Sequence, residues 1–164
     1  MNQLALPMTP TQALKHVIVP ALQELGPKYD SPRARLMLTA IALQESDLAH
    51  RRQQPGPARG LWQFEQGGGV RGVLNHPSSK RDAARLCELH GVAATPAALY
   101  AALEHDDVLA AGIARLLLWT LPQSLPAPGD ADAAWAQYLD AWRPGKPHRN
   151  RWTSAYRAAM AAVS

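Results

Sequence analysis

The sequence predicts a mainly α-helical fold in a single domain over residues 1–164. Ala and Leu dominate the apolar residues, there is one Phe, and clusters that favour strands are scarce. Ser, Thr or Asp recurs at expected helix starts, often followed by Pro, as is typical of the N-cap and first helical positions. A chain of 164 residues without repeats, linkers or low-complexity tails fits one hydrophobic core.

Two helices are predicted in the first 49 residues. Thr9-Pro10 begins a helix that continues to about Leu25 and carries an apolar face. Ser31-Pro32 begins a second helix, which ends between Glu45 and Ala49. Seven of the eight residues 36–43 are apolar, so this helix is expected in the middle of the core.

A break in helical structure follows. Residues 50–60 carry Pro55-Gly56-Pro57 and several charges, which indicates a surface loop. The next apolar residues, 61–64, lie between Gly60 and the run Gly67-Gly68-Gly69. We expect a small irregular or short β segment near residues 58–68, either an extended piece or a turn that lines a cleft.

The rest of the chain is again predicted to be helical. A helix from Ser78 or Ser79 ends at Gly91, and Pro122 ends a strongly apolar helix. A Pro-rich connector over 123–129 precedes the last two helices. The predicted helices in this part span about 79–90, 95–104, 108–121, 130–142 and 150–163.

Charge and cysteine content restrict the function classes. The net charge of +4 and the pI of about 9.6 favour anionic partners such as nucleic acid or the bacterial envelope. A single cysteine excludes an internal disulfide framework, and the six histidines show no metal-ligand spacing, so neither a metal nor a cofactor is expected. The N-terminus lacks the basic region of a signal peptide, and no stretch is apolar enough to span a membrane. The bacterial cytoplasm is the expected location unless the protein is exported or packaged.

Glu45 is the strongest candidate for a catalytic group. It stands at the C-terminal end of the predicted buried helix. There, loss of hydration and the negative pole of the helix dipole both raise the pKa of a carboxyl group. A raised pKa is what a general acid working near neutral pH requires.

Four segments in this order resemble the soluble lytic transglycosylase and goose-type lysozyme superfamily. Gln44-Glu45-Ser46 matches the Glu-Ser that ends a buried helix in that family, and Gly60-Leu61-Trp62-Gln63 matches its G-L-M-Q segment at the usual spacing. The segment 107–117 resembles the third motif, and 141–145 stands where the family has A-Y-N-x-G. The resemblance covers roughly residues 30–150 and implies a lysozyme-like helical domain.

The resemblance implies cleavage of the β-1,4 bond between N-acetylmuramic acid and N-acetylglucosamine in peptidoglycan. Glu45 would be the general acid/base. Ser46 could hydrogen-bond its carboxyl group or a sugar, and Gly60 would let the backbone approach the substrate. The segment Gly60-Leu61-Trp62-Gln63 is expected to bind the glycan, with Trp62 stacking on a pyranose ring and Gln63 pairing with hydroxyl or acetamido groups.

Two reaction outcomes stay open. In a lytic transglycosylase one carboxyl group acts first as acid and then as base, and the muramyl 6-hydroxyl gives a 1,6-anhydro product. In a lysozyme a second carboxylate positions water. Glu65 is the candidate for that second group, because goose-type lysozymes have an Asp at the corresponding place.

The match departs from the family in its later motifs. Trp142 replaces the usual Tyr, whose hydroxyl would approach the catalytic acid. Tyr138, one helical turn earlier, could supply a substitute hydroxyl or simply pack in the core. The third motif has Arg115 and Leu116 in place of its tyrosine. These changes keep an alternative open: a catalytically weak glycan-binding or virion structural module of the same fold.

The expected partner is a peptidoglycan glycan strand. Size, charge and the absence of an export signal resemble bacteriophage muralytic proteins, either endolysins or components that contact other virion proteins. A basic cluster near the C-terminus would attract the anionic cell wall or form a solvated face. Nucleic acid is the less favoured partner, because no DNA- or RNA-binding signature accompanies this cluster. The cluster comprises Arg143, Lys146, His148, Arg149 and Arg151.

Overall fold

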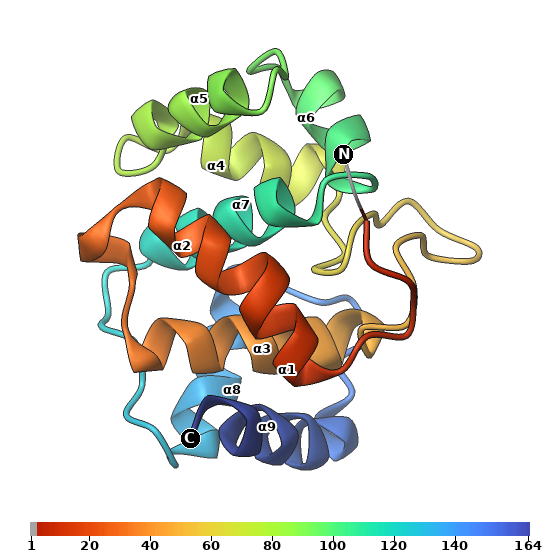
Figure 1. Ribbon diagram of the computed structural model, residues 1–164, viewed down its shortest axis with the longest axis vertical. Coiled ribbons are helices and arrows are strands. Elements are labelled where there is room, and N and C mark those ends of the chain that lie inside the picture. The colour runs from red at the N-terminus through yellow and green to blue at the C-terminus, as the bar shows by residue number, and fades with distance from the viewer. Residues whose placement is uncertain (1–2) are drawn as a thin grey trace.

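The computed structural model describes residues 3–164 and is mainly helical, which confirms the predicted fold class (Figure 1). Residues 1 and 2 belong to the predicted domain and to the N-terminal segment without signal-peptide features, and they lie outside the described residues. No helix within 3–164 combines the length and apolar character needed to cross a membrane. The elements are α1 (Pro10–Ala13), η1 (Leu14–Ile18), α2 (Val19–Leu25), η2 (Pro27–Tyr29), α3 (Pro32–Ser46), η3 (Gln66–Val70), α4 (Arg71–Asn75), α5 (Lys80–Leu89), α6 (Pro96–Leu103), α7 (Asp107–Trp119), α8 (Ala131–Trp142) and α9 (Arg149–Val163).

Helix α3 lies in the middle of the molecule. Helices α8 and α9 lie below it in Figure 1, α1 and α2 cross it, and α4, α5 and α6 gather at the opposite end. The Ser31 hydroxyl caps α3 by accepting a hydrogen bond from the amide of Ala34 at 3.0 Å. Residues 36–44 are all buried, as the run of apolar residues predicts. The helix ends where Asp47 adopts the left-handed conformation, φ 55°.

The first predicted helix is continuous from Pro10 to Leu25 but contains a π-helical turn, η1. This turn ends just before Val19-Pro20. Pro20 has no backbone N–H to donate to the preceding turn, and a widened turn accommodates the missing hydrogen bond. The predicted apolar face is buried, as expected: Leu14, Val17, Ile18, Leu22 and Leu25.

The irregular segment near 58–68 contains two isolated antiparallel bridges. Arg59 pairs with Arg52 on one side and with Phe64 on the other. Beyond it, η3 and α4 form helical structure that the sequence pattern did not predict. The cause is tertiary packing: Val70 and Val73 are buried, and a Cβ on Gly69 would meet the Phe64 ring at 2.7 Å. The glycine run permits this close approach, although glycine disfavours helices.

A half-buried histidine links the end of α5 to α2 and to the start of α7. His90 follows α5, and its Nδ1 lies 2.7 Å from Asp106, the N-cap of α7, while its Nε2 lies 2.7 Å from Glu24 of α2. Hydrogen bonding to Asp106 is the main effect that raises the pKa of His90 from 6.5 to about 9. The imidazolium therefore stabilises the folded state while it is protonated.

This contact predicts that stability falls as the pH rises from 6.5 to 9. The folded state holds the His90 proton more tightly than the unfolded chain, so the stabilisation is complete below pH 6.5 and lost above about 9. We expect a loss on the order of 2 kcal/mol in the free energy of unfolding across this range. Urea unfolding at successive pH values measures it. The His90→Gln variant should lose this dependence, and a variant of the exposed His105, His105→Gln, should keep it.

Candidate active site

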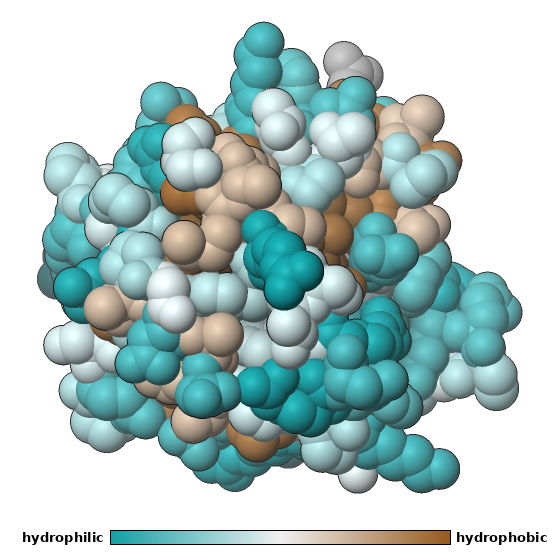
Figure 2. Space-filling model, turned by 90° about the horizontal axis from the view of Figure 1, so that it is seen from below, coloured by the Kyte–Doolittle hydropathy of each residue, from teal (hydrophilic) through white to brown (hydrophobic). Residues whose placement is uncertain are grey.

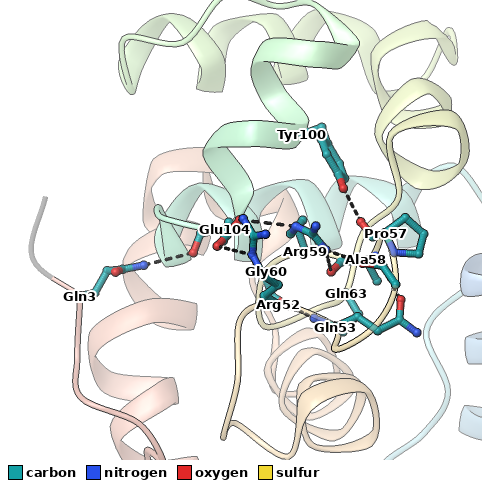
Figure 3. A network of polar contacts seen from close by, with 11 residues as sticks. Gln3, Arg52, Gln53, Pro57, Ala58, Arg59, Gly60, Gln63, Tyr100 and Glu104 are labelled. Atoms are coloured by element: carbon teal, nitrogen blue, oxygen red, sulfur yellow. Dashed lines mark hydrogen bonds and ion pairs between the residues drawn. The ribbon is translucent and has the colours of Figure 1, made fainter.

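The segment that carries the Gly-Leu-Trp-Gln motif is held in place by polar contacts with α6 and the residues after it (Figure 3). Glu104 pairs with Arg52 at 3.0 Å and with Arg59 at 3.5 Å. The Tyr100 hydroxyl donates to the carbonyl of Pro57, and the Arg59 guanidinium lies 6.0 Å from the Tyr100 ring. The loop thus has a defined conformation although it lies on the surface.

Gly60 is required by packing against the protein itself. Its φ is 81°, and a Cβ there would lie 2.5 Å from the carbonyl oxygen of Leu103 at the end of α6. The sequence predicts close approach of a substrate at this position. That expectation is corrected: the group that approaches the Gly60 backbone is another part of the chain.

Glu45 lies in the last turn of α3 and is half-buried. Its Oε2 accepts a hydrogen bond from the Tyr138 hydroxyl of α8. Burial raises the pKa of Glu45 from 4.5 to about 6 and outweighs the Tyr138 hydrogen bond and the charge of Arg151, which both lower it. The negative charge of Glu65 adds to the rise. The carboxyl group is therefore poised to exchange a proton near neutral pH.

Tyr138 supplies the hydroxyl that the Trp at position 142 cannot supply. Its ring is stacked on Trp152 of α9, with centroids 5.4 Å apart and planes at 13°, and it also faces Trp142 at 6.2 Å. The residue is almost fully buried, at 2% exposure. Packing and hydrogen bonding thus act together at this position, because the rigid stack holds the hydroxyl on the Glu45 carboxylate.

A cavity of about 480 Å³ opens beside this region. Glu65 lines it, whereas the Glu45 side chain is not among the lining residues. The negative charge of the cavity residue Glu65 contributes to the raised pKa of Glu45, and the ring of Trp142, which lines the cavity, lies 6.2 Å from that of Tyr138. The lining comes from the 63–76 segment (Gln63, Phe64, Glu65, Gly67, Gly68, Gly69, Gly72 and His76), from the end of α7 and just beyond (Leu117, Thr120 and Leu121) and from the end of α8 (Asp140, Ala141, Trp142 and Arg143).

Three residues expected to bind substrate are buried instead. Trp62 is fully buried, and its indole N–H donates to the Leu38 carbonyl at 3.0 Å, so it cannot stack on a sugar. Ser46 is also fully buried and donates to the carbonyl of Leu61 at 2.7 Å, so its hydroxyl holds the loop on α3 and does not contact the Glu45 carboxyl group or a sugar. Leu61 lies in the core. These contacts explain the motif structurally: it fastens the loop to the end of the helix that carries Glu45.

Three of the predicted residues reach the cavity, whereas Glu45 and Tyr138 are not among its lining residues. Gln63 lines it in a left-handed conformation, φ 53°, and its side-chain amide donates to the Gly60 carbonyl at 2.8 Å. Trp142 lines it with a half-buried ring, and its indole N–H donates to the Trp62 carbonyl at 2.9 Å. Glu65 is exposed within it. An aromatic side chain, an amide and a carboxylate therefore line one opening.

Sequence reasoning missed several lining residues. Asp140 and His76 face the cavity from opposite segments, and four glycines form part of its wall. The position of Asp140, two residues before Trp142 at the end of α8, is a signal that could have identified it. Among residues 3–164, no group of three or more His, Cys, Asp or Glu is arranged to hold a metal ion.

Comparisons with known proteins leave the site to be interpreted from its own geometry. No model of a known protein family matches this chain, and neither the curated proteins nor the solved structures contain a match.

The Tyr138–Glu45 contact predicts a change in pH dependence. In Tyr138→Phe the hydrogen bond that favours the carboxylate is lost, so the pKa of Glu45 should rise above 6, by about one pH unit. The pH titration profile of the Glu45 carboxyl group, followed by NMR, should move upward accordingly. Tyr156→Phe is the matched control, because Tyr156 belongs to the same aromatic cluster and its hydroxyl contacts Gly129 instead. An unchanged profile in Tyr138→Phe would contradict the assigned role.

Proposed function

We propose that this protein is a peptidoglycan-degrading muramidase that cleaves the β-1,4 bond between N-acetylmuramic acid and N-acetylglucosamine. The observation that carries the proposal is Glu45. It is a half-buried carboxyl group at the end of the central helix, its pKa is raised to about 6, and a tyrosine hydroxyl holds it. The motif resemblance supplies the substrate class.

Glu45 would act as the general acid and then as the general base. At neutral pH a group with a pKa near 6 is protonated in a usable fraction of molecules and can also accept a proton back. Tyr138 donates to Oε2, and within residues 3–164 no hydrogen bond to Oε1 is found. Oε1 can therefore face the glycosidic oxygen while Tyr138 keeps the carboxyl plane fixed. Trp142 and Gln63 would bind the sugars next to the bond that is cleaved.

Glu65 decides between the two outcomes of the reaction. It is exposed in the cavity, and its negative charge raises the pKa of Glu45, which supports the proposal that it would position water for hydrolysis. If Glu65 serves this purpose, the products carry reducing ends and Glu65→Gln loses activity. If Glu45 works alone, the products are 1,6-anhydromuropeptides and Glu65→Gln retains activity.

Incubation of the purified chain with peptidoglycan, followed by mass spectrometry of the soluble fraction, tests the proposal. We expect soluble muropeptides whose end groups identify the reaction. A Glu45→Gln preparation made in parallel detects contaminating hydrolases. Intact peptidoglycan after incubation with the native chain would refute the enzymatic proposal.

One observation favours a second candidate function, a glycan-binding or virion structural module with little or no catalytic activity. The cavity is lined by residues suited to carbohydrate, but the Glu45 side chain is not part of its lining. In this case the native chain and Glu45→Gln would sediment equally with peptidoglycan, and neither would release muropeptides.

A further inference from the structure

The C-terminal part of the chain carries positive charge without acidic residues. Residues 141–164 contain five Lys or Arg and no Asp or Glu. We call the basic side chains of this segment the C-terminal basic surface; all of them are exposed. They are Arg143, Lys146, His148, Arg149, Arg151 and Arg157.

Most of this charge is not neutralised within the protein. Arg149 pairs with Asp132 at 2.8 Å. Among residues 3–164, no carboxylate lies within ion-pair distance of Arg143, Lys146, Arg151 or Arg157. Helices α8 and α9 form one end of the molecule, and Figure 2, which views that end, shows hydrophilic side chains over much of the face. An exposed cluster of unpaired cations attracts anions in solution.

Two residues of the C-terminal basic surface lie next to the proposed active site. Arg143 lines the cavity, directly after Trp142. Arg151, on the first turn of α9, is close enough to Glu45 to lower the pKa of its carboxyl group. A polymer bound in the cavity would therefore continue onto this surface.

The distribution of charge indicates which polymer fits. Glu65 and Asp140 place two carboxylates in the cavity, against one guanidinium, that of Arg143 at its border, whereas the rest of the C-terminal basic surface lies outside. A nucleic acid carries a phosphate on every residue and would be repelled in the cavity. Peptidoglycan has uncharged sugars in its glycan backbone and carboxylates on its stem peptides, so it matches an acidic cavity with a basic border.

We infer that the C-terminal basic surface binds the carboxylates of peptidoglycan stem peptides and holds the glycan strand in register with the cavity. This inference rests on the proposed function for its substrate. Because the interactions are exposed ion pairs, each contributes modestly and is screened by salt. The summed binding free energy of these ion pairs determines how long the protein stays bound to the cell wall.

Co-sedimentation with purified peptidoglycan sacculi tests the inference. The measurement uses the Glu45→Gln background, in which cleavage does not interfere with binding. The double variant Lys146→Gln/Arg157→Gln should bind about tenfold more weakly at low salt. The matched control Lys80→Gln/Arg81→Gln removes the same charge from two exposed residues of α5 and should bind normally. A second test uses sacculi whose carboxyl groups have been amidated. The parent chain should bind these sacculi as weakly as the Lys146→Gln/Arg157→Gln variant binds native sacculi.

Several results would overturn the inference. The first is that both double variants reduce binding to sacculi equally, or that neither reduces it. The second is that amidation of the sacculi leaves binding unchanged. The third is that the C-terminal basic surface binds duplex DNA more tightly than it binds sacculi. Thermal unfolding of both variants checks that each is folded as the parent is. A native chain that releases no muropeptides refutes the cleavage proposal alone, since the binding measurement does not depend on catalysis.

Discussion

Glu45→Gln is expected to reduce the release of muropeptides from peptidoglycan by about a thousandfold. Glutamine has nearly the same shape and can still accept the hydrogen bond from Tyr138, but it cannot deliver a proton to the leaving oxygen. The measurement is the initial rate of release, followed by chromatography of the soluble products. Glu88→Gln, at an exposed position of α5, is the matched control and should retain full activity.

Glu45→Gln is also expected to affect the thermal stability of the protein. Burial disfavours the ionised form of Glu45, which is why its pKa is raised to about 6. At pH 7 the neutral amide removes this unfavourable charge, so the unfolding temperature should equal or exceed that of the native chain. Loss of activity together with loss of stability would contradict a specifically catalytic role, because it would indicate a structural one.

Gly60→Ala is expected to destabilise the protein by about 3 to 4 kcal/mol. Two effects add at this position: a φ of 81°, which an alanine adopts only with strain, and a Cβ placed 2.5 Å from the Leu103 carbonyl oxygen. That oxygen is a backbone atom and cannot move out of the way without shifting the end of α6. Urea unfolding gives the loss in the free energy of unfolding.

Gly91→Ala separates the two effects. Gly91 also has a positive φ, 69°, but a Cβ there would meet nothing within 4 Å. Its cost should be the backbone strain alone, about 1 kcal/mol. Equal destabilisation by the two substitutions would mean that the contact with Leu103 contributes nothing.

The helices were predictable because their signals are local. The capping residues Thr9, Ser31, Thr95 and Asp130 each accept the hydrogen bond expected of an N-cap. The burial of residues 36–44 follows from a run of apolar side chains in one helix. By contrast, η3 and α4 were missed, since the three glycines within η3 lower helix propensity and the close packing of Gly69 against Phe64 and Leu117 is a tertiary contact.

Of the candidate site, the sequence predicted the burial of the helix that carries Glu45 but not the contacts around it. Glu45 at the end of a buried helix could be identified from the sequence, because helix ends and burial follow from nearby residues. Trp62 could not be assigned, since an indole beside a glycine loop suits a sugar platform and a core position equally well. Its indole N–H donates to the Leu38 carbonyl of α3, 24 residues earlier in the sequence, and this contact is not encoded locally.

The sequence by itself determined a mainly helical protein with a carboxyl group at the end of its central helix, since capping, periodicity and burial of a uniformly apolar segment are encoded within a few residues. The tertiary structure alone decided that the Tyr138 hydroxyl contacts Glu45 and that Ser46 binds the loop. It also decided which of Trp62 and Trp142 faces a cavity. These contacts join residues up to 93 positions apart, and their partners are selected by packing among helices, which no local pattern specifies.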